Sequence, residues 1–460
     1  MQHPERSAPD VVVIGGGVSG LTAAVSLAGS GFSVSLLEQK QHCGGRTYSF
    51  IHKETGDEVD NGQHLMMGCY HFTFRYLSEV GATSLVAVQE NLSVSFRHAE
   101  RGLFRLQAPP LPAPLNVIVG LLRLRSLSIG QRLSLLRVGT ALLSAAPDSD
   151  ERLQSMTVTQ WLDALHQSKE NKESLWNILA IGTLNDSPDM VSAALFIKVL
   201  RSAFLGGKLD SSMVIPKRGL SPVLVDKGIE YLTRNGGRVC TETTVEKAEV
   251  DRGEITKLVL NSGEVIAPRA VVSAVPYFDL PRMFGAATSA LLPDTSSADS
   301  FISSPIITIH LWFDRGFMDE DFTALLDSPI HWVFNKSRIF EKKSGGGYLS
   351  LVVSGARSLI EKEKEEIVAM CLSELRRFYP ASDKASLLHS LVVKEKRATF
   401  SPRIGTEQIR PAHTTQIRNL FLAGDWTDTK LPATIEGAAQ SGYRCGELVQ
   451  QYLGTAPGDK

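Results

Sequence analysis

The stretch DVVVIGGGVSGLTAAVSL, residues 10–27, decides the fold. Its first part is a run of apolar, mostly β-branched residues, which predicts a buried strand, and its last part has the composition and spacing of a helix. Between them, Gly15, Gly17 and Gly20 form the pattern Gly-x-Gly-x-x-Gly. The first glycine allows a sharp turn, the second lets the backbone approach a pyrophosphate, and the third lets the helix pack closely on the strand. This order of elements predicts a dinucleotide-binding turn.

A second apolar run, residues 32–37, ends in Glu38. An acid at this place can accept hydrogen bonds from an adenosine ribose, and it would repel a 2′-phosphate. The first helix meanwhile offers free N–H groups and the positive end of its dipole to the phosphates. Strand, glycines, helix, second strand and acid occur at the spacing that the motif needs, so we predict an α/β fold with a Rossmann-type domain.

The segment CGGRT, residues 43–47, indicates which dinucleotide is bound. It resembles the Gly-Gly-Arg signature of flavoproteins related to amine oxidases and carotenoid desaturases. The resemblance implies FAD as the cofactor and a GR2-like flavoprotein fold, in which Gly45 and Arg46 contact the FAD pyrophosphate.

A second segment near the other end of the chain agrees with this assignment. FLAGDWT, residues 421–427, followed by LPATIEGAAQSG, residues 431–442, is similar to the C-terminal flavin motif of the same flavoproteins. The resemblance implies that an apolar strand positions the two residues that follow it, a glycine and an aspartate whose carboxylate binds the ribityl chain, and that a helix then directs its N-terminus at the electron-rich edge of the flavin. The residues concerned are Gly424 and Asp425 after the strand, and Thr434 and Ile435 at the start of the helix.

The segment DNGQHLMMGCY, residues 60–70, narrows the resemblance. It is similar to the hydroxysqualene dehydroxylases, also described as squalene-associated FAD-dependent desaturases, of bacterial hopanoid synthesis. The resemblance implies that the backbone near Gly62 passes beside the flavin ring. Gln63 or His64 could handle a substrate hydroxyl, but each could equally only support the loop. Asp60 is expected to be structural, accepting hydrogen bonds from turn N–H groups.

The length of 460 residues predicts two domains. A discontinuous α+β substrate-binding domain is expected to alternate along the chain with the FAD-binding domain. In the second FAD segment, the resemblance implies that the backbone at Val245 meets the adenine. We assign residues 1–85, 210–280 and 400–460 to the FAD-binding domain, and residues 86–209 and 281–399 to the substrate-binding domain.

Between Glu100 and Asp148 the chain carries no acidic residue but several arginines among leucine-rich segments. Residues 115–146 predict basic amphipathic helices, a composition suited to an anionic membrane surface. The alternative is that these helices pack within the substrate domain with their arginines solvated. The arginines are Arg101, Arg105, Arg123, Arg125, Arg132 and Arg137.

Composition limits the other classes of function. A net charge of −1 gives no reason to expect a nucleic acid partner, and five scattered cysteines without metal-ligand spacing predict neither a metal site nor a disulfide framework. The polar opening residues 1–9 do not resemble a secretion signal, and no apolar run reaches the roughly 20 residues of a membrane span. We therefore expect a cytoplasmic protein, at most peripheral on the inner face of the cytoplasmic membrane.

The resemblance implies FAD-dependent reductive dehydroxylation of hydroxysqualene to squalene, with an apolar isoprenoid as substrate and an electron donor that the sequence does not specify. Two enzyme alternatives are a carotenoid-type polyene desaturase and an amine oxidase. A different class is a prenyl-lipid-binding chaperone of the GDP-dissociation-inhibitor type, which shares this architecture. The intact flavin motifs favour an enzyme.

Overall fold

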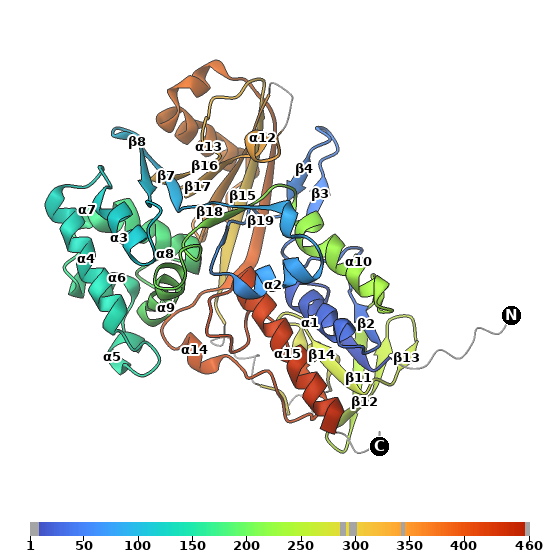
Figure 1. Cartoon of the computed structure of the whole chain (residues 1–460). Helices are drawn as coiled ribbons and strands as arrows, with labels where there is room; N and C mark the ends of the chain where they lie inside the picture. The colour runs from blue at the N-terminus through green and yellow to red at the C-terminus, as the bar shows by residue number, and fades with distance from the viewer. Residues whose placement is uncertain (1–8, 286–290, 294–300, 342–345, 456–460) are drawn as a thin grey trace.

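The computed structural model describes residues 9–285, 291–293, 301–341 and 346–455. The opening segment in which we expect no secretion signal therefore lies outside the described residues, except for Pro9. Two sheets dominate the described part of the chain, one at each end of the molecule, and a lobe of helices lies beside the second sheet (Figure 1).

A five-stranded parallel sheet is the centre of the first domain. Its central strand is β1, and alternate residues of β1 pack on opposite faces of the sheet. Val11 and Val13 lie in one core with helices α1 and α15. Val12 and Ile14 lie in another core with strands β11 and β12. A parallel strand that is buried on both faces has a continuous apolar sequence, as residues 11–14 do. The strands, in spatial order, are β10 (Arg238–Cys240), β2 (Val34–Leu37), β1 (Val11–Ile14), β14 (Ala270–Ser273) and β20 (Leu420–Leu422).

Helices α1 (Val18–Gly29) and α15 (Ile435–Thr455) lie side by side on one face of this sheet (Figure 1). The predicted Rossmann-type α/β fold is therefore confirmed, and its strands come from all three segments assigned to the FAD-binding domain. The other elements of these segments are β3 (Ser49–Ile51), β4 (Glu58–Asp60), β5 (Met66–Met67), α2 (His71–Glu79), β9 (Met213–Pro216), α10 (Lys227–Arg234), β11 (Val245–Asp251), β12 (Glu254–Leu260), β13 (Val265–Ile266) and α14 (Thr406–Ile409).

A seven-stranded, mostly antiparallel sheet forms the second half of the molecule. The parallel pairing of β16 with β7 joins the two separate passes of the chain, residues 86–209 and 281–399, into this one sheet. Its strands, in spatial order, are β19 (Leu387–Phe400), β15 (Ser303–Phe313), β18 (Gly347–Ser354), β17 (Trp332–Asn335), β16 (Phe322–Leu326), β7 (Ser93–His98) and β8 (Gly102–Gln107).

The alternation of β15 divides its side chains between two environments. Ile307, Ile309 and Leu311 pack against helix α13 (Lys364–Phe378), so the residues that alternate with them face the other way. Those residues are Thr308, His310 and Trp312. His310 bonds the backbone of Asp60, and Trp312 packs on Val59. This face of β15 is therefore turned toward the FAD-binding domain.

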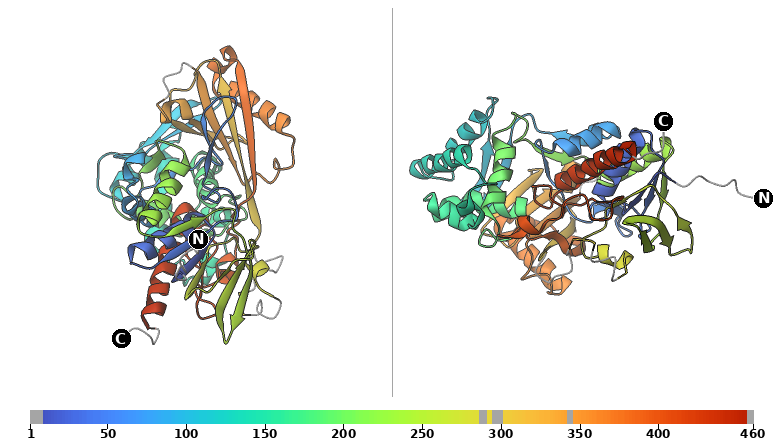
Figure 2. Two further views of the ribbon diagram at one scale, coloured as in Figure 1. Left: turned by 90° about the vertical axis from the view of Figure 1, so that its right-hand side faces the viewer. Right: turned by 90° about the horizontal axis from the view of Figure 1, so that it is seen from below.

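A helical lobe packs on the side of the seven-stranded sheet opposite α13 (Figure 2). Helices α3 and α4 occupy the basic stretch for which helices were predicted, and Ser128 and Gln131 form a capping box at the start of α4. The helices of the lobe are α3 (Leu115–Leu122), α4 (Ile129–Ser144), α5 (Glu151–Gln154), α6 (Val158–Ala164), α7 (Lys169–Asn171), α8 (Asn177–Leu184) and α9 (Ala193–Phe204).

Candidate active site

Each glycine of the turn between β1 and α1 has a different physical role. Gly15 has a φ of +105°, which glycine adopts without strain. A Cβ on Gly20 would lie 1.9 Å from the carbonyl oxygen of Gly15, so the helix could not approach the strand with any larger residue there. Gly17 caps α1 and would have nothing within 4 Å of an added Cβ. Open space at a helix N-terminus fits a pyrophosphate.

Glu38 lies against this turn at the end of β2. Its Oε2 accepts a hydrogen bond from the Gly16 N–H at 2.8 Å, and its Oε1 accepts one from the Lys40 N–H at 2.9 Å. The segment leading to Val245 passes beside it, because the Thr243 N–H donates to the Glu38 carbonyl at 2.9 Å. The structure thus brings the residues predicted for the ribose and the adenine to one end of the sheet, while their contacts with the cofactor stay predictions.

The Gly-Gly-Arg turn packs directly on the glycine turn. Gly45 has a φ of +59°, and a Cβ on it would lie 3.2 Å from the Cα of Gly17. Arg46 then extends to the C-terminal motif, where its Nη2 lies 2.8 Å from Oδ2 of Asp425. The two segments on which the flavin resemblance rests are therefore joined by an ion pair across 379 residues of sequence.

The C-terminal motif turns sharply between β20 and α15. Gly424 has a φ of +149°, and its N–H donates to Ser441 Oγ at 2.7 Å. The hydroxyl of Thr434 accepts a hydrogen bond from the Gly437 N–H at 3.1 Å, so Thr434 caps α15 and Ile435 is its first residue. The helix begins where the sequence predicted.

Arg410 stabilises this C-terminal turn through hydrogen bonds to its backbone, and the sequence did not predict this role. Its side chain is fully buried and donates to the carbonyl oxygens of Thr427, Asp425 and Leu431 at 2.7–2.9 Å. Buried backbone carbonyls need such partners. A lone arginine between two loops gives no sequence signal of this role.

Asp60, the last residue of β4, anchors the loop that follows through hydrogen bonds and an ion pair. Its Oδ1 accepts hydrogen bonds from Ser49 Oγ and from the Leu220 N–H, both at 2.8 Å, which agrees with the structural role expected for it. Its Oδ2 lies 2.9 Å from Nζ of Lys336, a partner that the sequence did not reveal. Burial alone would raise the pKa of Asp60, but the Lys336 ammonium and these hydrogen bonds hold it below its usual range.

His310 and Tyr348 support the same loop from behind. The His310 Nε2–H donates to the Asp60 carbonyl at 3.2 Å, and the Tyr348 hydroxyl donates to His310 Nδ1 at 3.0 Å. Burial lowers the pKa of His310 to about 3, so its ring is neutral. The one sequence signal was the alternation of β15, which placed His310 on the same face as Thr308 and Trp312.

Gln63 and His64, the two candidate catalytic residues, lie next to each other and are part-buried. Gln63 Oε1 accepts a hydrogen bond from Lys336 Nζ at 2.8 Å, and His64 Nδ1–H donates to the Gly62 carbonyl at 2.8 Å. Burial lowers the pKa of His64, which favours a neutral ring with Nε2 as an acceptor. His64 thus makes the bracing hydrogen bond that the sequence offered as one alternative. Proton delivery by His64 stays a hypothesis.

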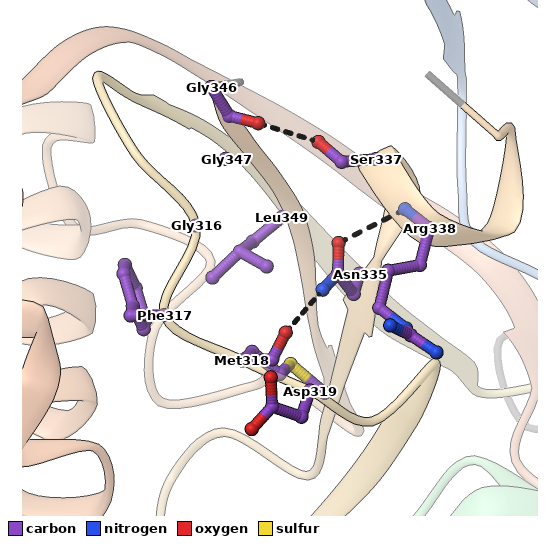
Figure 3. A pocket seen from close by; sticks show the side chains of 10 residues that line it. All are labelled: Gly316, Phe317, Met318, Asp319, Asn335, Ser337, Arg338, Gly346, Gly347 and Leu349. Carbon is purple, nitrogen blue, oxygen red and sulfur yellow. Dashed lines mark hydrogen bonds between the residues drawn. The ribbon is translucent and has the colours of Figure 1, made fainter. Parts of the chain in front are cut away.

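A pocket of about 250 Å³ lies elsewhere, at the end of the seven-stranded sheet (Figure 3). Met318, Asn335, Arg338 and Leu349 are among its lining residues, and Asn335 Nδ2 donates to the Met318 carbonyl at 2.7 Å. It contains none of the predicted site residues and is smaller than the roughly 300–1,000 Å³ of ordinary ligand pockets. We do not assign the substrate to it.

The flavin containing amine oxidoreductase family matches residues 18–449. The chain belongs to this family. It is an FAD-dependent oxidoreductase, and the structure brings the glycine turn and the two segments that resemble flavin motifs together.

The relatives agree with the resemblance that the sequence indicated. A hydroxysqualene dehydroxylase of Rhodopseudomonas palustris is 29% identical over 443 residues, covering 95% of this chain and 98% of the relative. A 15-cis-phytoene desaturase of Narcissus pseudonarcissus is 28% identical and covers 98% of this chain and 81% of the relative. Cyclohexylamine oxidase of Brevibacterium oxydans has the same fold, with a TM-score of 0.70 at 16% identity over 97% of this chain and 100% of that one.

Proposed function

We propose that this protein catalyses the FAD-dependent reductive dehydroxylation of hydroxysqualene to squalene in hopanoid biosynthesis. The observation that carries the proposal is the loop of residues 60–64, which sets two polar side chains, Gln63 and His64, in fixed positions beside Gly62. A hydroxyl on the substrate would need such partners, whereas a polyene hydrocarbon would not. The similarity to a hydroxysqualene dehydroxylase over 95% of the chain supports the same reaction.

The reaction requires that the C–O bond break with its electron pair going to oxygen, that this oxygen take a proton and leave as water, and that the allylic carbon accept a hydride. Reduced FAD supplies the hydride when bound. The chain's part is to hold the phosphates at the start of α1, to orient the allylic carbon and to donate hydrogen bonds to the departing oxygen. An external two-electron donor would be needed to return the flavin to its reduced form.

An anaerobic turnover experiment tests this reaction. The purified, FAD-loaded protein is reduced, hydroxysqualene is added, and flavin reoxidation is followed by visible absorbance while extracts are analysed for squalene. Reoxidation with a matching amount of squalene supports dehydroxylation. Oxidised protein that instead becomes reduced by phytoene would favour the desaturase alternative, and reduction by a primary amine would favour an amine oxidase.

We also propose that α3 and α4 rest on an anionic bilayer at the inner face of the cytoplasmic membrane. Three apolar side chains of α4 are mostly exposed, Ile129 at 73%, Leu133 at 55% and Leu143 at 66%. Arg123, Arg125 and Arg137 of the same stretch are also exposed, and apolar residues together with cations suit anionic lipid.

Arg132 behaves differently from these arginines. It donates to the Leu127 and Leu122 carbonyls at the end of α3, so it is tied to the protein and not solvated as the packed alternative expected of these arginines. In the part of the chain that the structure describes, no helix has the length and apolar character needed to cross a bilayer. The contact that we propose is therefore with the bilayer surface.

A further inference from the structure

A buried lysine joins the two domains at the loop of residues 60–64. Lys336 is the first residue of the short helix α12 (Lys336–Ile339), directly after β17 in the substrate domain. Its side chain is 1% exposed, and that of its ion-pair partner Asp60 is 2% exposed. The ammonium also lies 3.8 Å from the centre of the Phe340 ring. A charge so far from water persists only when its partners are well placed.

Lys336 determines which end of the Gln63 amide faces outward. An ammonium only donates hydrogen bonds, so the group 2.8 Å from Nζ must be the amide oxygen of Gln63. The amide nitrogen then lies on the other side, 3.3 Å from the His64 carbonyl. The amide nitrogen has two N–H groups and directs one of them at the His64 carbonyl, so the other N–H of this part-buried side chain is left to donate to an approaching molecule.

The contacts that the structure describes for His310 and Lys336 hold the loop without passing a proton to it. His310 bonds the backbone carbonyl of Asp60, not its carboxylate, and a peptide carbonyl does not carry a proton onward. Lys336 reaches the loop through a carboxylate that is already ionised and through an amide oxygen. The arrangement is suited to holding groups in place and not to relaying protons.

We propose that Lys336 is a positioning residue that orients the Gln63 amide so that its N–H donates to the hydroxyl oxygen of the substrate. This inference rests on the proposed dehydroxylation. A donor at this oxygen stabilises the negative charge that develops as the C–O bond breaks, whereas a reversed amide would accept from the hydroxyl and stabilise only the intact alcohol.

A double-mutant cycle on turnover tests the proposal. Lys336→Met and Gln63→Leu should each lower kcat by roughly tenfold to hundredfold with little change in KM, and the double variant should be no slower than the slower single variant. Lys396→Met removes an exposed lysine of the same domain and should leave kcat unchanged. Effects of Lys336→Met and Gln63→Leu that multiply would show that Lys336 does not act through Gln63 and would overturn the proposal.

Hydrogen exchange of the peptide covering residues 58–66 gives a readout that needs no substrate. Lys336→Met should speed exchange in residues 60–64, and Lys396→Met should not. If Lys336→Met fails to fold, the pair Lys336→Met with Asp60→Asn removes both charges and allows the same comparison. Unchanged exchange with an active wild type overturns the role of Lys336 alone, whereas a wild type that forms no squalene overturns the proposed function.

Discussion

The glycine turn of residues 15–20 and the loop of residues 60–64 are built in opposite ways. The first depends on backbone geometry among near neighbours: a positive φ at Gly15 and the approach of Gly20 to its carbonyl. The second depends on side chains from distant parts of the chain, since Lys336 and His310 are 276 and 250 residues from Asp60. A larger side chain should therefore disrupt the glycine turn. Removing the charge of Asp60 or protonating the neutral ring of His310 should instead disrupt the loop of residues 60–64.

The largest expected effect is on the glycine turn. Gly20→Val would place its Cβ 1.9 Å from the Gly15 carbonyl oxygen, which is far closer than two such atoms can approach. The helix must therefore move, and FAD binding should be lost. The measurement is flavin absorbance per mole of purified protein. Gly139→Ala is the control, because an added Cβ there meets nothing within 4 Å, and it should keep its full flavin content.

The next effect concerns the buried ion pair. Asp60→Ala leaves the Lys336 ammonium buried without its carboxylate and should lower the free energy of unfolding by about 3–5 kcal/mol. Urea unfolding of the purified protein measures this change. The matched exposed pair is Lys396 with Glu361, where Glu361→Gln should cost less than about 1 kcal/mol. Equal costs at the two sites would contradict the contrast between buried and exposed charge.

A change that is smaller over any one pH unit is expected from the neutral histidine behind the loop. The folded pKa of His310 is about 3 against an ordinary 6.5, so below pH 6.5 the unfolded chain takes up a proton that the folded chain does not. Stability should fall as the pH drops from 6.5 toward 3, by about 1.4 kcal/mol per pH unit from this residue. His310→Asn should lower the slope of the unfolding free energy against pH by about the contribution of one proton, as measured by urea unfolding at several pH values.

The smallest effect tests the surface of the helical lobe. Arg137→Glu should weaken binding to vesicles of anionic phosphatidylglycerol by about 1–2 kcal/mol, since each cation near such a surface contributes about 1 kcal/mol. Flotation at low and high salt measures the change. Arg252→Glu alters an exposed arginine of the β11–β12 hairpin in the other domain and should have no effect. Binding that is equal on neutral phosphatidylcholine vesicles would contradict an electrostatic contact.

Much of the first domain could be predicted because its signals are local. The β-branched run before Gly15, the order of the glycines and Glu38 at the end of β2 are each properties of adjacent residues. The start of α15 at Ile435 was predicted from the resemblance of residues 431–442 to the C-terminal flavin motif, and Thr434 caps the helix there.

The candidate site could be predicted only in part, because a buried charge shows its role only once its partner is known. The sequence singled out Gln63 and His64, yet the lysine that orients Gln63 stands in an ordinary stretch after β17. Arg46 and Asp425 were both singled out, but as separate contacts of the cofactor and not as an ion pair.

By itself, the sequence determined the α/β dinucleotide fold, since glycine sterics and strand periodicity act between neighbours in the chain, and its resemblance to known flavoproteins implied FAD as the cofactor. Only the tertiary structure decided which side chains compensate Asp60 and which end of the Gln63 amide faces outward. Those choices follow from burial, because removing a charge from water makes its stability depend on groups that folding brings together from separate passes of the chain.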